Sequence, residues 1–268
     1  MKVAVCLSGF ARIFPYTYPY LKKYILDPLN ADTFFYGYSQ NDKEIFADDI
    51  LDVYKPVKHV IREWDTSVED EIWNVYGTKE IGRTELYTKP INILSMHYNI
   101  FKSNELKIQY EQENNFTYDL VIRSRTDMFY FREINATELS MAMMPMTVWI
   151  PTVWDFRGIT GYGTTDHFAF GSSHAMNLYS NLINREAEYN IEHDFLLHPE
   201  SMIGYNLHIE GVNRIGSDLP HYWNSLEEFK KRGHYDTLGD FSYCYIDGHT
   251  SSPPRHEGGH KKYVKDEE

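Results

Sequence analysis

Residues 118–131 read YDLVIRSRTDMFYF, and this stretch changes abruptly from apolar to charged. The Leu-Val-Ile run at 120–122 predicts a buried strand, because apolar and β-branched residues favour strands. Side chains alternate between the faces of a strand, so Arg123, Arg125 and Asp127 are expected on one side. Two guanidiniums and one carboxylate at the end of a buried strand are costly unless they are paired. The stretch therefore indicates either a ligand site or an internal Arg–Asp ion pair that fixes a loop.

The position of these charges suggests which ligand they would take. In α/β sheets, ligands bind beyond the carboxyl ends of the strands. A phosphate group there would engage Arg123 and Arg125, and a divalent metal bridging phosphate oxygens would engage Asp127. If this stretch is a ligand site, we therefore expect the ligand to carry a phosphate group.

Apolar patterns of strand and helix alternate on both sides of this stretch. We predict strands over 2–7, 31–38, 57–61 and 147–153, and helices over 18–26, 44–54 and 91–113. The β-α-β-α-β order predicts an α/β protein with a Rossmann-like, mainly parallel central sheet flanked by helices. The polar segment Thr66–Pro90 is either a loop or an inserted helix.

The first predicted strand runs into Ser8, Gly9 and Arg12, within SGFAR. A strand followed by a Ser-Gly turn with an arginine is a candidate nucleotide-contacting loop. The chain has neither the GxGxxG nor the P-loop pattern, so dinucleotide or Walker-type binding is not predicted.

Composition narrows the classes of protein to consider. The net charge of −13 argues against a nucleic-acid binder, since such proteins carry basic patches. The aromatic fraction of 16% suits carbohydrate or nucleoside faces. No apolar run approaches the roughly 20 residues that cross a bilayer, and the amino terminus reads as a strand rather than a secretory signal. We expect no transmembrane segment and a cytoplasmic location.

Four blocks in order resemble the nucleotide-sugar-dependent glycosyltransferases of the GT-A type found in surface-glycan and capsule clusters and in large DNA viruses of algae. The blocks are CLSGFAR at 6–12, YDLVIRSRTDMFY at 118–130, TDHFAFGSS at 165–173 and HPESMIGYNL at 198–207. The resemblance implies a single GT-A-like domain over 1–248. Residues 1–131 would bind the nucleoside diphosphate sugar and 132–248 the glycan acceptor, followed by a flexible polar tail at 249–268. The implied donor is a UDP-sugar.

In such enzymes an Asp-x-Asp motif after a central strand holds a divalent metal, Mn²⁺ or Mg²⁺, on the diphosphate. The matching place here is Arg125-Thr126-Asp127, so only the second aspartate is present. Asp127 is the expected metal ligand, and Arg125 could supply part of the metal's charge. A second ligand could come from histidines of the tail, at 249, 256 or 260.

Sugar transfer requires charge stabilisation on the departing diphosphate and, if the reaction inverts, a carboxylate that deprotonates the acceptor. Asp166, which follows a Gly-rich segment, is the first candidate for this base or for an acceptor-binding carboxylate, and Glu200, after Pro199, is the second. His167 is a further donor-binding candidate. Whether the reaction inverts or retains stays open. The alternative is a catalytically silent sugar- or nucleotide-binding protein with the same fold, which the missing first aspartate would favour.

Overall fold

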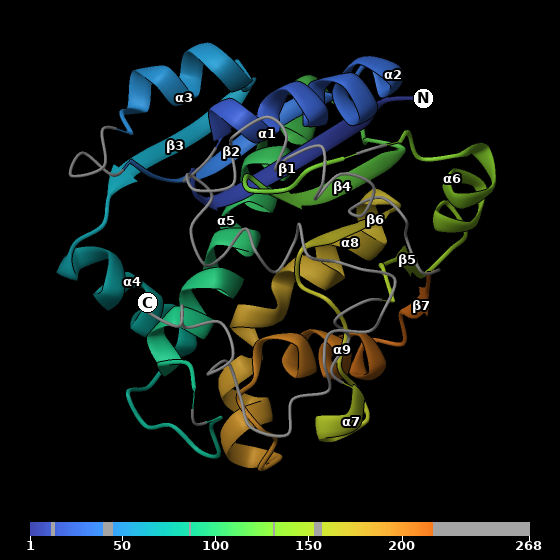
Figure 1. The fold of residues 1–268 in the computed structure, drawn as a ribbon. Helices are drawn as coiled ribbons and strands as arrows, with labels where there is room; N and C mark the ends of the chain where they lie inside the picture. Colours follow the sequence, from blue (N-terminus) through green and yellow to red (C-terminus); the bar gives the residue numbers. More distant parts are fainter. Residues whose placement is uncertain (12–13, 40–44, 86, 131, 153–156, 217–268) are drawn as a thin grey trace, which may run out of the picture.

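The computed structural model describes residues 1–11, 14–39, 45–85, 87–130, 132–152 and 157–216. Within these residues, seven strands form one sheet in the order β3-β2-β1-β4-β6-β5-β7 (Figure 1). The strands are β1 (Val3–Phe10), β2 (Asp32–Ser39), β3 (Lys58–Glu63), β4 (Leu120–Arg125), β5 (Thr147–Trp149), β6 (Phe168–Gly171) and β7 (Asn213–Ile215).

The sheet is mainly parallel. Strands β3, β2, β1 and β4 pair in parallel, and β5 pairs in parallel with β7. Strand β6 lies between β4 and β5 and runs antiparallel to both. The predicted α/β class, with a mainly parallel sheet flanked by helices, is therefore confirmed.

Helices cover both faces of the sheet, and the alternation of each strand supplies a separate core to each face (Figure 1). On β1, Ala4 and Cys6 pack into one core while Val3, Val5 and Leu7 pack into the other. The first core is closed by α4 (Thr66–Tyr76), α5 (Pro90–Asn114), α8 (Ser173–Ser180) and α9 (Pro199–Ile209). The second is closed by α1 (Phe14–Leu21), α3 (Ala47–Tyr54) and α6 (Ala136–Ala142). The short helices α2 (Asp27–Leu29) and α7 (Arg157–Thr160) lie in connections.

A buried lysine joins the long helix α5 to α8. Lys107 is fully buried, and its Nζ lies 3.0 Å from Glu111 Oε2 and 2.6 Å from Ser173 Oγ. Glu111 Oε1 accepts from the Tyr118 amide and from the Ser173 hydroxyl. Because every charge in this cluster is paired, its burial is tolerated, and it fixes α5 beside the loop that leads into β4.

Several element boundaries differ from those predicted. Strand β1 continues to Phe10, so Ser8 and Gly9 belong to the strand rather than to a following turn. Helix α1 begins at Phe14 and continues into a π-helical turn, Lys22–Leu26. The segment Thr66–Pro90, predicted as a loop or a helix, contains α4.

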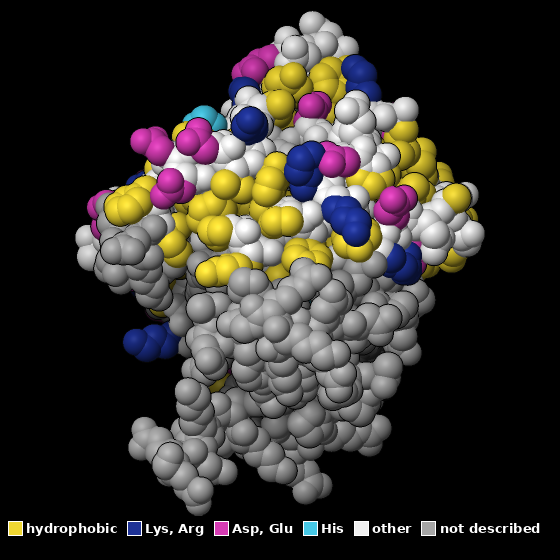
Figure 2. All heavy atoms as spheres, turned by 45° about the horizontal axis from the view of Figure 1, so that its top comes forward, with side chains coloured by type: hydrophobic (Ala, Val, Ile, Leu, Met, Phe, Trp, Pro, Cys, Tyr) yellow, Lys and Arg dark blue, Asp and Glu magenta, His cyan; other side chains and the backbone are white. Residues whose placement is uncertain are grey.

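The surface of the described residues mixes apolar and charged side chains. Figure 2 shows lysines and arginines interspersed with aspartates and glutamates on the face that it presents. Among the helices of the described part of the chain, none has the length and apolarity to cross a membrane.

Candidate functional site

The candidate site lies where β1 and β4 end and β6 begins. Ser8 on β1 is the register neighbour of Arg125 on β4, and two residues earlier Cys6, which packs in the core under α5 and α8, is the register neighbour of Arg123. Strand β6 runs against β4, with Phe168 opposite Ser124, so Asp166 and His167 reach the same edge from the other side. The topology thus brings residues far apart in sequence to one edge of the sheet.

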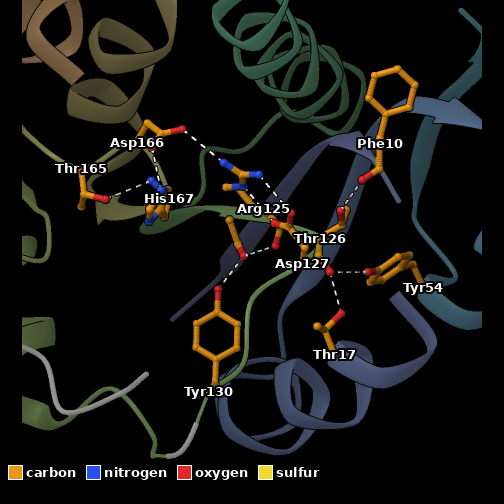
Figure 3. Close-up of polar contacts among 11 residues, drawn as sticks. Phe10, Thr17, Tyr54, Arg125, Thr126, Asp127, Tyr130, Thr165, Asp166 and His167 are labelled. Atoms are coloured by element: carbon orange, nitrogen blue, oxygen red, sulfur yellow. Dashed lines mark hydrogen bonds and ion pairs between the residues drawn. The ribbon is translucent and has the colours of Figure 1, made fainter. Parts of the chain in front are cut away.

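Arg125 lies at the centre of this edge, between two carboxylates (Figure 3). Its Nε and Nη2 donate to the two oxygens of Asp127, at 2.9 and 3.0 Å. Its Nη1 lies 3.6 Å from Asp166 Oδ2. The Arg125 side chain is 18% exposed, whereas those of Asp127 and Asp166 are 5% and 4% exposed. The guanidinium is therefore the member of this trio that reaches the surface.

Hydrogen bonds fix the backbone around Arg125. The Thr126 hydroxyl donates to the Phe10 carbonyl at 2.8 Å, and the Thr126 carbonyl accepts from Thr17 at 2.6 Å and from Tyr54 at 3.5 Å (Figure 3). These bonds join the end of β4 to the end of β1 and to helices α1 and α3. The side chains of Arg125 and Asp127 consequently project from a fixed segment.

Two glycines allow β1 and β2 to approach at this edge. Gly9 has φ +99°, a conformation that other residues rarely adopt. A Cβ on its neighbour Gly37 would lie 2.0 Å from the Gly9 carbonyl oxygen, so only glycine fits there. Gly9 and Gly37 therefore let the backbones of β1 and β2 lie close together at this edge.

Arg123 lies deeper than Arg125 and is differently partnered. It is 2% exposed, and its Nε and Nη1 have no hydrogen-bond partner among the described residues. Tyr179 on α8, also buried, has an unpartnered hydroxyl and interacts with the Arg123 charge. Unpaired buried donors are costly, so this guanidinium is a candidate to bind an oxygen-rich ligand.

His167 and Asp166 form a buried pair with defined charges. Burial lowers the pKa of His167 below its ordinary value, against the opposing effect of Asp166, so the imidazole is neutral at neutral pH. Its Nε2 lies 2.9 Å from Asp166 Oδ1 and donates to it. Burial alone would raise the pKa of Asp166, but His167 and the guanidiniums of Arg125 and Arg123 together lower it. Asp166 is therefore a fixed anion.

The pKa of Glu200, in the first turn of α9, is shifted in the opposite direction from that of Asp166. Burial, and next the negative charge of Asp166, raise its pKa well above the ordinary value. Its carboxyl group lies beside His198, whose Nδ1 is 3.6 Å from Glu200 Oε2. Burial lowers the pKa of His198 to about 4, so this imidazole is neutral too. Two carboxylates with pKa values driven apart are the pattern expected of an acid–base site.

The described residues do not fit the predicted metal at Asp127. Both of its oxygens already accept hydrogen bonds from Arg125. The residues that the structure describes contain no group of three or more His, Cys, Asp or Glu side chains able to hold a metal ion. Asp127 is thus a partner of arginine in this fold, and the ion-pair alternative describes its contacts.

Most predicted site residues meet at this edge. Arg12 and the tail histidines lie outside the described residues. His198 was not predicted, although its position directly before a proline at the start of a helix is a capping signal. The His198 ring accepts from the Ser201 amide at 3.3 Å and so closes the amino terminus of α9.

A family model described as a domain of unknown function, DUF7796, matches residues 1–184. The chain belongs to this family. The match includes the edge formed by Arg123, Arg125, Asp127, Asp166 and His167, and it ends before α9, so Glu200 and His198 of this DUF7796 member lie beyond it.

Other comparisons gave distant likeness only. The crystal structure of mouse xyloside xylosyltransferase 1 in its apo form is similar over 94% of this chain and 98% of that chain, with 12% sequence identity and a TM-score of 0.44. A likeness of this size transfers no site residues or activity to the DUF7796 member. No curated protein matches the chain in sequence.

Proposed function

We propose that the chain is a glycosyltransferase that moves a sugar from a nucleoside diphosphate sugar, a UDP-sugar, to a glycan acceptor. The observation that carries this proposal is the Arg125 guanidinium held between Asp127 and Asp166, with the Glu200 carboxyl group near enough to interact with Asp166 and Arg125. Sugar transfer needs positive charge for the leaving diphosphate and a proton acceptor for the attacking hydroxyl, and this edge supplies both. The sequence blocks suggest a surface or virion glycan as the acceptor, and the halves 1–131 and 132–248 as the donor and acceptor sides.

In the proposed reaction, the acceptor hydroxyl loses its proton to the Glu200 carboxylate and its oxygen bonds to the anomeric carbon. The bond from that carbon to the diphosphate breaks, and the electron pair leaves with the diphosphate, opposite Arg125 and Arg123. Asp166 was the first candidate for the base, but its contacts with His167 and Arg125 make it a weak proton acceptor. We assign it to positioning Arg125, and proton transfer to Glu200.

This assignment predicts a pH dependence. Glu200 acts as a base only when ionised, and its pKa is raised, so kcat/KM should increase with pH through a value above the ordinary glutamate range. In Glu200→Gln this acidic limb should disappear and kcat should fall by roughly 10²-fold or more, the usual contribution of general acid–base catalysis. If kcat/KM of Glu200→Gln showed the same increase with pH as the wild type, Glu200 would not be the general base.

The test of activity is incubation with a panel of UDP-hexoses and UDP-pentoses, with oligosaccharide acceptors, followed by UDP release and product mass. The proposal predicts an added sugar residue with one donor, and much less of it with Glu200→Gln. A catalytically silent binding protein, which the Arg125–Asp127 pair would also suit, would bind a UDP-sugar and yield neither product nor UDP.

A further inference from the structure

We propose that the donor diphosphate is bound without a divalent metal, by the guanidinium of Arg125 with Arg123 behind it. This inference rests on the proposed function, because it concerns how the same edge holds the donor. It replaces the metal expected from the family resemblance with a cation that belongs to the chain.

The first argument is the state of the Asp127 carboxylate. A metal ligand needs an oxygen lone pair directed at the ion, and Arg125 occupies both Asp127 oxygens in a bidentate pair at 2.9 and 3.0 Å. The Asp127 side chain is 5% exposed, so the pair is shielded from water and is firmer than a surface ion pair. A metal at Asp127 would have to displace an arginine that is itself held by neighbouring strands.

The second argument is the supply of other ligands. Mg²⁺ requires six oxygens around it, mainly carboxylates, phosphates and waters. Asp166 already faces His167 and Arg125 through its two oxygens, and Glu200 Oε2 lies 3.6 Å from His198 Nδ1.

The third argument is what the arginines offer in its place. Arg125 is fixed by two carboxylates and reaches the surface, so its charge is oriented before any ligand arrives. Arg123 is buried, with Nε and Nη1 that no described residue accepts from. A guanidinium binds phosphate oxygens through paired N–H groups and stays charged at every physiological pH. These are the properties that a metal would otherwise supply to a leaving diphosphate.

The experiment is calorimetric titration of the full chain with UDP, in EDTA and in Mn²⁺. We expect dissociation constants within about twofold of each other, because the binding charge comes from the protein. Arg125→Gln should weaken UDP binding by about tenfold or more in both buffers, since it removes charged hydrogen bonds. Asp127→Asn should weaken it less and should not alter the response to Mn²⁺. Arg83→Gln is the matched control, because the Arg83 side chain is exposed and pairs with Asp194 rather than with a carboxylate of this edge.

The outcomes separate the two claims. UDP binding that disappears in EDTA, returns with Mn²⁺ and loses its Mn²⁺ response in Asp127→Asn would overturn the metal-free site while supporting a nucleotide-binding protein. Absence of UDP binding in both buffers would refute the proposed function and this inference with it. Thermal melts of each variant show whether a loss of binding comes from unfolding, and Arg125→Lys provides a second variant that keeps the charge but cannot make the bidentate pair.

Discussion

At the residue scale, the site is defined by how its charges are partnered. Asp166 is buried and Glu200 is partly buried at one edge of the sheet, yet the pKa of Asp166 is lowered and that of Glu200 is raised. Burial raises both pKa values, but His167 and the guanidiniums of Arg125 and Arg123 lower that of Asp166, whereas the charge of Asp166 raises that of Glu200 further. Residue type alone could not have distinguished them, because both are acidic residues.

Glu200 should make the folded protein less stable as pH rises. Its folded-state pKa is raised, so between its unfolded and folded pKa values the folded state holds the extra proton. Glu200→Gln should therefore be more stable than the wild type at pH 8, with the difference fading below about pH 4, where the acid is protonated in both states. Each unit of pKa shift corresponds to about 1.4 kcal/mol, and 1 kcal/mol to roughly 2–4 °C in Tm for a chain of this size.

Denaturant unfolding at several pH values measures this difference. Glu192→Gln, at an exposed position, is the control and should follow the wild type. If Glu200→Gln followed the wild type at every pH, Glu200 would not lie in a buried site beside an anion.

The sequence was a good guide to which residues gather but not to how they pair. The run of Arg123, Arg125 and Asp127 at the end of a buried strand predicted either a ligand site or an Arg–Asp ion pair, and Arg125 does pair with Asp127. The full set of partners of Arg125 could not be predicted, because it includes a contact across the sheet. Arg125 also faces Asp166, which is separated from it in sequence by two helices and a strand. Such contacts arise from the strand order, which local patterns do not contain.

At the element scale, long periodic patterns and unbroken apolar runs predicted the elements correctly, whereas shorter patterns predicted elements with shifted boundaries. The long helix α5 and the apolar strands β1, β2 and β4 were predicted because their periodicity is long or their apolar runs unbroken. The helix predicted over 44–54 begins only at Ala47, as α3, and the strand predicted over 147–153 is shorter, β5 ending at Trp149. Boundaries are the part of a prediction that local patterns determine least.

The approach of β1 and β2 depends on Gly37, and its replacement tests how the edge is built. Gly37→Ala would put a Cβ 2.0 Å from the Gly9 carbonyl oxygen, a backbone atom that cannot rotate away. We expect a loss of roughly 1–3 kcal/mol in unfolding free energy, the usual cost of overpacking, with weaker UDP binding because Ser8 and Arg125 shift. Gly158→Ala is the control, since a Cβ there meets nothing within 4 Å. Equal urea midpoints for the two variants would contradict this packing.

At the scale of the whole molecule, an acidic protein concentrates two arginines at one edge of its sheet. The net charge is −13, so an anionic donor needs a local positive region to overcome the general repulsion. Arg123 and Arg125 place two guanidiniums at the carboxyl ends of parallel strands, the place where α/β proteins bind ligands. At the opposite edge of the sheet, where β4 begins, the surface has a groove lined by residues including Gln112, Phe116 and Thr117. Among the described residues, no arginine lines this groove.

The most direct test of the central claim is hydrogen exchange of the whole chain with and without UDP, read by mass spectrometry. The account predicts slower exchange in peptides that cover 8–10, 123–128, 164–168 and 198–202, with no change over 108–117 at the opposite edge. Protection confined to 108–117, or no protection at saturating UDP, would contradict the proposal that this edge binds a nucleoside diphosphate.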